Sequence, residues 1–406
     1  MNTNGSDPVL GSPTLPPDAA SRPLLSIGLA VYNGESHLRV AIDSLLAQDV
    51  GDLELVISDN ASTDDTRAIC LEYVEADSRV RYHCNAENIG AAANYQQVFE
   101  MCSGEYFMWG SDDDIWEPRF AGECISRLES SPKAVLCTAG VMFITDDGER
   151  DSTVAYRSID TDGMPVEGRV HELISRPIWY GIYGVIRPTA LRAAPSFLPV
   201  YGGDVCLLLE LMLLGDLIAV PEPLFSYRLP SKPRTVADHV NDVRPPESGA
   251  TPREPTRAPY TSLARELLGI LDRSSLDDTT VRRIQDDLAE TLCIVNLDWG
   301  RSILSEQGLS LDQLRADGAA LPAVRAALGL APARDGLEER QSAPEAWSMH
   351  DGVKLAPGRQ MLLRLLQPFS DRQNALNAER ARALELLAYE VRRLQHRIEA
   401  LERGRA

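Results

Sequence analysis

The 406-residue sequence contains no hydrophobic run long enough to cross a membrane and no closely spaced pair of cysteines. Its most apolar stretch, residues 205–214, is interrupted by Glu210, whereas a membrane span needs about 20 apolar residues. The seven cysteines are an odd number without a C-x-x-C pair, which argues against a disulfide framework and a structural zinc site. Residues 1–23 lack the basic start and apolar core of a signal peptide. These absences predict a soluble protein of the cytoplasm.

Basic side chains are also scarce: 40 Lys and Arg stand against 60 Asp and Glu, for a net charge of −20. Proteins that bind nucleic acids neutralise phosphates with a surplus of basic residues, so no nucleic-acid partner is expected. A single phosphate-bearing ligand is still compatible with this charge, because a bound metal ion can screen it.

Apolar runs of strand length alternate with amphipathic segments through the first third of the chain. Such runs indicate strands buried on both faces of a parallel sheet, and the alternation predicts an α/β fold with helices on both faces. The expected strands are 24–31, 53–58, 80–83, 105–109, 134–138, 141–145 and 217–220. The expected helices are 35–48, one ending near Tyr73, 90–101 and 204–214.

Changes in composition divide the chain into several segments. A length of 406 residues allows about two or three domains. We expect a disordered leader (1–23), an α/β domain (24–230), a proline-rich linker (231–259), a helical region (260–330), a loop (331–357) and a C-terminal helix (358–406).

The C-terminal helix has the clearest periodicity in the sequence. Apolar residues fall on alternating steps of three and four, as in a coiled-coil seam. They are Leu384, Leu387, Val391, Leu394, Ile398 and Leu401. The pattern fits a helix packed on its own domain, a homodimeric coiled coil or a seam for another protein. Between Lys354 and Arg405 basic residues outnumber acidic ones by 11 to 6, so peripheral contact with the inner membrane face is a further alternative.

Three adjacent carboxylates, Asp112, Asp113 and Asp114, follow the expected strand 105–109. Neighbouring carboxylates repel one another unless a cation compensates their charge. Open α/β folds place ligands at the carboxyl ends of their strands, so this triplet is a candidate oxygen site for Mg²⁺ or Mn²⁺. The alternative is a solvated acidic turn that caps the next helix.

Polar loops follow three other expected elements, and they converge with the triplet at one edge of the sheet. Asp59 can accept the imide N–H of uracil or thymine, and Tyr32 offers a face on which a base can stack. Asn88 and Gly90 open a helix, where free N–H groups suit a phosphate. Each loop alone is compatible with ordinary turn chemistry.

These motifs together resemble those of family 2 glycosyltransferases, which have a GT-A fold and use nucleotide sugars. The matching segments are 30–35 (AVYNGE), 58–64 (SDNASTD), 87–94 (ENIGAAAN) and 109–114 (WGSDDD), and the likeness extends over about 24–228. The resemblance implies that Asp59 and the loop at Tyr32 hold the base. It implies a DXD-type motif in which Asp112 and Asp113 contact the donor and Asp114, with Asp112, binds Mn²⁺ or Mg²⁺. Further donor-site residues implied by the match are Asn33, Glu35, Asn88, Gly90 and Asn94.

The resemblance also implies a general base in the acceptor-side half of the domain. Asp204 stands where that acid is expected, although Gly203 replaces the glutamate that many relatives carry before it. The alternative is that Asp204 only caps the following helix. Trp179 and Tyr180 offer aromatic faces for an acceptor sugar, with core packing as an equal contender. Arg228, with Lys232 and Arg234, is expected after the last strand, in a loop over the diphosphate, with the solvated start of the linker as an equal alternative.

The predicted activity is therefore metal-dependent, inverting transfer of a hexose from a UDP- or dTDP-sugar to a hydroxyl group. The acceptor is a glycan, a lipid-linked sugar or a small molecule. A nucleotidyltransferase acting on sugar phosphates is the enzymatic alternative, although it usually has a glycine-rich basic loop after the first strand. A non-catalytic scaffold that acts through its C-terminal helices is the second alternative.

Overall fold

The computed structural model describes residues 22–150, 158–194, 197–230, 239, 258–316 and 318–332. Met1–Ala331 form one compact unit, and a second unit begins at Pro332. The predicted C-terminal coiled-coil helix, most of the leader and most of the linker therefore lie outside the described residues.

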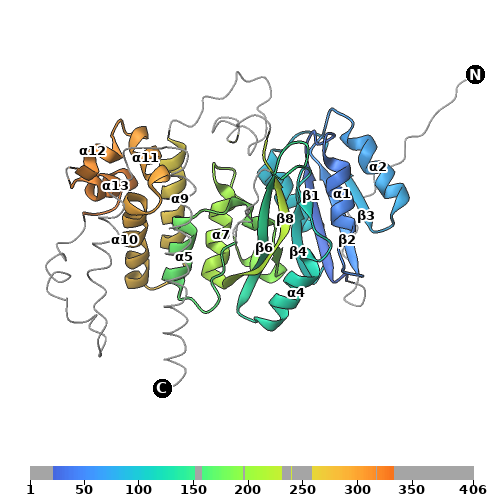
Figure 1. Ribbon diagram of the computed structural model, residues 1–406, viewed down its shortest axis with the longest axis horizontal. Helices are drawn as coiled ribbons and strands as arrows, with labels where there is room; N and C mark the ends of the chain where they lie inside the picture. The colour runs from blue at the N-terminus through green and yellow to red at the C-terminus, as the bar shows by residue number, and fades with distance from the viewer. Residues whose placement is uncertain are drawn as a thin grey trace, which may run out of the picture. The chain divides into compact units, whose positions relative to one another are not determined.

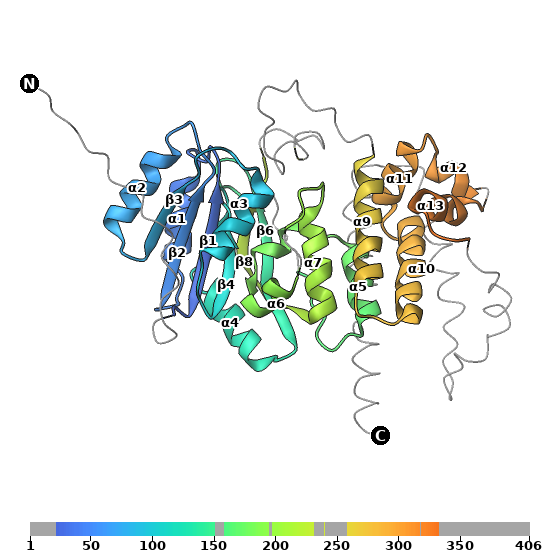
Figure 2. The same cartoon turned by 180° about the vertical axis from the view of Figure 1, so that it is seen from behind.

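Four parallel strands form the first half of an eight-stranded sheet. They are β1 (Leu25–Val31), β2 (Leu53–Asp59), β3 (Val80–Cys84) and β4 (Tyr106–Gly110). Helices α1 (Leu38–Leu46) and α2 (Thr66–Ala76) cover one face, and α3 (Ala91–Glu100) covers the other (Figures 1 and 2). This placement follows from right-handed crossovers, because the chain steps from β1 outward to β3 and then returns to β4.

The second half of the sheet is mixed. It adds β5 (Ile115–Trp116), β6 (Ala134–Ile144), β7 (Val185–Ile186) and β8 (Asp216–Arg228), for an order of β3-β2-β1-β4-β7-β6-β8-β5. Strand β7 is antiparallel to both neighbours, whereas β6 and β8 are parallel. Helix α4 (Phe120–Ser130) packs against β6 and β8. The predicted mostly parallel sheet with helices on both faces is confirmed.

Two expectations for this half were wrong. The segments 134–138 and 141–145 are a single strand, β6, and the last strand does not end at Val220 but continues through Pro221 and Pro223 to Arg228. Shifts in register on both sides of Gly140 leave Pro221 unpaired and place Pro223 opposite Gly140, so the strand accommodates both prolines at an irregularity of the ladder. Gly140 has no side chain to collide with the carbonyls of Pro221 and Glu222 that face it.

Helix α7 (Gly203–Leu214) joins this sheet to the rest of the unit. It is apolar on nearly every side, which is typical of a fully buried helix. It packs against β6 and β8 on one side and against α5 (Val166–Ser175) and α9 (Pro259–Arg273) on the other (Figures 1 and 2). Helices α5 and α6 (Pro188–Ala193) were not predicted from the sequence.

The predicted C-terminal helical region is confirmed as far as Leu328. It consists of α9, α10 (Asp278–Ile294), α11 (Leu297–Glu306), α12 (Leu311–Ala316) and α13 (Ala320–Leu328). Helix α10 begins where the Asp277 side chain accepts hydrogen bonds from the N–H groups of Thr279 and Thr280. Among the residues described, no helix combines the length and the apolar character that spanning a bilayer requires.

Candidate active site

The sheet has a topological switch point between β1 and β4, where successive crossovers leave in opposite directions. Ligands of open α/β folds bind at the carboxyl ends of the strands at such a point. The loop after β1 and the acidic triplet after β4 meet here. A Cβ atom at Gly34 would overlap the Asp112 carboxylate and the Val31 side chain, so only glycine fits at this position.

The loops after β1 and β2 are strained and held together by hydrogen bonds. Asn33 and Ala61 have positive φ values of 54° and 61°, a conformation that costs about 1–3 kcal/mol for a residue other than glycine. Asn33 Oδ1 accepts the N–H of Thr63 (2.8 Å), and Glu35 Oε2 accepts the N–H of Asp65 (2.9 Å). Asn33 and Glu35 therefore brace the two loops, while Tyr32 is 47% exposed and leaves its ring open to a ligand.

Asp59 ends β2 and is 0% exposed. Its Oδ1 accepts the N–H of Ser62 (2.8 Å), and its Oδ2 accepts the hydroxyl of Tyr82 (2.7 Å). Both oxygens thus organise the loop after β2. Contact between Asp59 and a nucleotide base stays a prediction. For such a contact, Oδ2 must either accept a second hydrogen bond beside that of the Tyr82 hydroxyl or lose the bond to Tyr82.

Asn88, Gly90 and Asn94 belong to a buried network of amide side chains. The Gly90 N–H donates to Asn88 Oδ1 (2.8 Å), so it is already engaged within the protein. Asn94 is buried, accepts the Ser58 hydroxyl (2.7 Å) and donates to the Ser58 carbonyl (2.9 Å). In this arrangement the three residues tie the start of α3 to β2, and a phosphate contact at Gly90 stays a prediction.

The triplet is not a fully solvated turn, because Asp114 is only 1% exposed and Asp112 and Asp113 are half-buried. Asp114 Oδ1 accepts the N–H of Arg228 (2.7 Å), whereas Oδ2 is buried and has no hydrogen-bond partner among the described residues. Asp113 accepts the hydroxyl of Ser111. Burial and the neighbouring Asp113 raise the pKa of Asp112 to about 7 and the pKa of Asp114 well above its usual range.

A divalent cation fits these residues. The buried, unpartnered oxygen of Asp114 and the carboxylate of Asp112 are hard oxygen donors of the kind that Mg²⁺ and Mn²⁺ bind. No group of three or more His, Cys, Asp or Glu side chains suited to a metal occurs in the described part of the chain. Such an ion would therefore complete its coordination with water and phosphate oxygens, as Mg²⁺ commonly does.

Arg228 does not lie in a loop after the last strand, as the sequence suggested. It is the final residue of β8 and is 6% exposed. Its guanidinium donates to the carbonyls of Asp113 (2.6 Å), Thr145 (2.9 Å) and Asp146 (2.6 Å). It therefore fixes the backbone of the triplet, while Lys232 and Arg234 lie outside the described residues.

We expect Arg228→Met to destabilise the fold by about 3 kcal/mol and to weaken the response to Mn²⁺ at least about tenfold. The first effect arises because three main-chain carbonyls in part-buried contacts lose a charged donor, and the second because the triplet loses its support. Urea denaturation and a Mn²⁺ titration of melting temperature measure the two effects.

Arg187→Met is the matched control for this variant. The Arg187 guanidinium also donates to main-chain carbonyls, those of Ala134 (2.9 Å) and Leu128 (2.7 Å), but not to the triplet. It should lose comparable stability and keep the wild-type Mn²⁺ response. Equal Mn²⁺ responses in the two variants would contradict the role assigned to Arg228.

The second half of the site is aromatic. Trp179 begins the short 3-10 helix η1 (Trp179–Tyr183) and is 44% exposed, whereas Tyr180 is packed in the core. The Trp179 ring lies 6.3 Å from that of Tyr227. Burial raises the pKa of Tyr227 to about 12, and the charges of Asp114 and Asp204 contribute to the shift. Tyr227 thus lies within electrostatic range of both the triplet and Asp204.

Asp204 lies in the first turn of α7, but it does not cap the helix. The N-cap is Gly202, with a positive φ of 73°, and no side chain caps this end. Asp204 Oδ1 accepts the N–H of Val205 (2.7 Å), and burial raises the pKa of its carboxyl to about 6. Such a group is mostly ionised at pH 7 and is a stronger base than an exposed aspartate.

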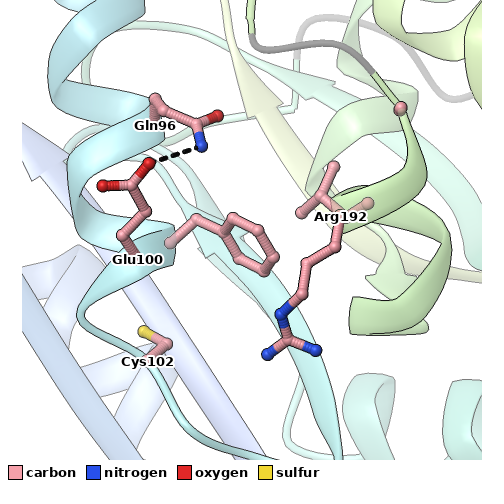
Figure 3. A pocket seen from close by; sticks show the side chains of 7 residues that line it. Gln96, Glu100, Cys102 and Arg192 are labelled. Atoms are coloured by element: carbon pink, nitrogen blue, oxygen red, sulfur yellow. Dashed lines mark hydrogen bonds between the residues drawn. The ribbon is translucent and has the colours of Figure 1, made fainter. Parts of the chain in front are cut away.

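A separate hollow of about 320 Å³ opens between α3 and α6 (Figure 3). The Arg192 guanidinium lies 5.7 Å from the ring of Phe99 there, and Gln96 donates to Glu100 (2.9 Å). Helix α3 starts at the carboxyl edge of the sheet and runs back to the opposite edge, where this hollow lies. None of the sequence-predicted site residues lines it, so it is distinct from the candidate active site.

The mixed sheet, its switch point and the acidic edge define a GT-A-type domain. Residues 26–164 match the family model described as Glycosyl transferase family 2. Relatives agree: the uncharacterized protein Rv1520 of Mycobacterium tuberculosis is 34% identical over 131 residues, or 32% of this chain and 38% of the relative. An uncharacterized glycosyltransferase of Rickettsia typhi, RT0329, is 38% identical over 118 residues, or 28% of this chain and 36% of the relative.

The match to these two relatives spans little more than a third of their length. Among solved structures, S. aureus TarS 1–349 in complex with UDP-GlcNAc superposes with a TM-score of 0.51 and 13% identity. That superposition covers 81% of this chain and 94% of the TarS chain, so it establishes a shared fold well beyond the family match.

Proposed function

We propose that the protein is a metal-dependent, inverting glycosyltransferase that moves a hexose from a UDP- or dTDP-sugar to an acceptor hydroxyl. One observation carries this proposal: the buried Asp114, with its unpartnered oxygen, and Asp204, with its raised pKa, both act on Tyr227. A cation-binding carboxylate and a basic carboxylate that both act on one residue are what a single displacement at a sugar carbon requires.

On the donor side, the exposed ring of Tyr32 stacks on the base, and Asp112 and Asp113 contact the ribose. Asp114 and Asp112 hold Mg²⁺ or Mn²⁺, which would neutralise charge on the departing nucleoside diphosphate. Arg228 keeps the triplet in place through its contacts with the backbone. TarS, whose fold this chain shares, is known in complex with UDP-GlcNAc, and the proposed donor belongs to the same class.

On the acceptor side, Asp204 takes the proton of the hydroxyl as its oxygen attacks the anomeric carbon. The new C–O bond forms as the bond to the diphosphate oxygen breaks, so the nucleoside diphosphate leaves with the bonding electrons. One displacement inverts the configuration of that carbon. The exposed face of Trp179 suits stacking on a sugar ring, which favours a glycan, a lipid-linked sugar or a small glycoside as acceptor.

A thermal-shift panel of UDP, dTDP and GDP, with and without Mn²⁺, tests this function. A nucleotide at about 100 times its Kd stabilises the folded state by about 2.7 kcal/mol, which raises the Tm by a few degrees. We expect such a shift for UDP or dTDP only when Mn²⁺ is present. No shift for any nucleotide would sink the proposal, and equal shifts without metal would remove its metal-dependent part.

A further inference from the structure

The turn that precedes Asp204 is covered by helix α9 of the helical region. A Cβ atom at Gly202 would overlap the end of the Leu263 side chain and would lie 3.2 Å from Leu263 Cγ. One residue earlier, the ring of Tyr201 lies 5.3 Å from that of Tyr260 at an angle of 66°. The first turn of α9 is therefore packed directly on the turn that presents Asp204.

Helix α9 is itself held in place by α11. Glu306, the last residue of α11, accepts the N–H groups of Tyr260 (2.9 Å) and Thr261 (2.8 Å) and the Thr261 hydroxyl (2.6 Å). A carboxylate that caps the start of a helix fixes both its position and its direction. A continuous set of contacts thus leads from α11 through α9 to the turn at Gly202.

We propose that the helical region is part of the transferase site, with Tyr260 and Leu263 as positioning residues that hold Asp204 in place for the acceptor hydroxyl. This inference rests on the role of Asp204 in the proposed function. It assigns a purpose to α9–α13, which lie outside the segment that matches the family model.

The covering by α9 also bears on the proton affinity of Asp204. Burial is the largest cause of its raised pKa. Titratable groups near this turn include Tyr227 on β8, Tyr201 before α7, Tyr260 on α9 and Glu306 on α11, and the ring of His239 lies 6.2 Å from that of Tyr201. The charges of Glu210 on α7 and of Glu266 and Arg273 on α9 act on Cys206, two residues after Asp204. Removing the Leu263 side chain admits water to the turn, so the pKa of Asp204 falls toward that of an ordinary aspartate.

The test is Leu263→Ala in the full chain, assayed for kcat/KM toward the acceptor against pH, at saturating donor and Mn²⁺. In the wild type, activity should fall with decreasing pH near pH 6, where Asp204 gains a proton. In Leu263→Ala this fall should move to lower pH by about one unit, and kcat should drop about 10- to 100-fold. The Tm shift caused by UDP or dTDP with Mn²⁺ should not change.

Two matched comparisons separate positioning from a general loss of stability. Leu311→Ala removes a buried leucine from α12 of the same region, and it should keep the wild-type pH profile. Gly202→Ala and Gly163→Ala both place alanine at a positive φ, 73° and 72°, but only position 202 is occupied by another side chain. Gly202→Ala should therefore lower kcat, while Gly163→Ala should not.

Tyr260→Phe removes a single hydroxyl and covers the case in which Leu263→Ala does not fold. It should lower kcat by a smaller factor than Leu263→Ala. Identical profiles for Leu263→Ala, Leu311→Ala and the wild type would overturn the inference, as would a normal kcat in both Gly202→Ala and Tyr260→Phe. A wild type that binds no nucleotide and transfers no sugar would instead refute the proposed function, so the two failures are distinguishable.

Discussion

Asp114→Asn is expected to abolish the Mn²⁺-dependent Tm shift by nucleotides and to reduce transfer about 100- to 1,000-fold. Asparagine keeps an oxygen that can accept the N–H of Arg228, but it loses the anionic oxygen that has no partner among the described residues. The cation then loses its buried ligand. Nucleotide titrations by thermal shift and an assay for release of nucleoside diphosphate measure the two effects.

The same substitution should raise the Tm of the metal-free protein at pH 7. Burial raises the pKa of Asp114 in the folded state, so the ionised carboxylate is less favourable in the folded chain than in the unfolded chain. This penalty is present above the ordinary pKa of an aspartate and disappears as the pH falls, and the neutral amide removes it at every pH. Stability and function therefore change in opposite directions, as is common for functional groups.

Asp216→Asn is the control for Asp114→Asn. Asp216 is a buried aspartate that pairs with Arg169 at 3.4 Å and begins the strand that Arg228 ends. The span of β8 between Asp216 and Arg228 pairs with β6 from Ala134 to Ile144, so Asp216 lies about 33 Å from the end of the strand that contacts the triplet. The control should keep its response to nucleotide and Mn²⁺. An unchanged metal response in Asp114→Asn, or an equal loss in the control, would refute the assignment of Asp114.

Asp204→Asn is expected to reduce transfer about 10²- to 10⁴-fold while nucleotide binding with Mn²⁺ stays intact. The amide cannot take a proton from the acceptor hydroxyl, but it leaves the donor half of the site unchanged. The wild-type dependence on a group with a pKa of about 6 should also disappear from the residual activity. Initial rates against pH and the thermal-shift titration together separate loss of chemistry from loss of binding.

Glu210→Gln provides the comparison on the same helix. Glu210 lies six residues after Asp204 in α7, and burial raises its pKa as well, but the charged groups that act on it are Arg273 and Glu266 of α9. Its substitution should leave transfer within about twofold of the wild type. If Asp204→Asn retained most of its activity, the general base would have to be another group.

The local parts of the fold and the position of the site could be predicted from the sequence. Apolar runs such as 24–31 and 53–58 form strands that are buried on both faces. A continuous apolar run of strand length is therefore enough to predict each strand. Alternation with helices then requires the loops at Tyr32, Asp59 and Asp112 to share one edge. The structure places these loops together, with Gly34 against Asp112.

The residues that support the site were not predictable in the same way. Pro221 and Pro223 looked like the end of a strand, because the register shift that accommodates them depends on Gly140, some eighty residues earlier. Arg228 consequently appeared to belong to a loop. The hydrogen bonds of the Asn94 side-chain amide and the packing of Leu263 on Gly202 also join residues that are far apart in the sequence. The spacing of residues along the chain does not predict such contacts.

The fully apolar surface of α7 has a consequence for where the chain can be divided. The sheet covers one side of this helix and α5 and α9 cover the other, so both halves share one hydrophobic interior. A fragment that stopped at residue 230, where the sequence motifs end, would present a leucine-rich helix side to water and invite aggregation. We therefore expect a well-behaved fragment that retains the acidic edge to extend to about residue 331, where the compact unit ends.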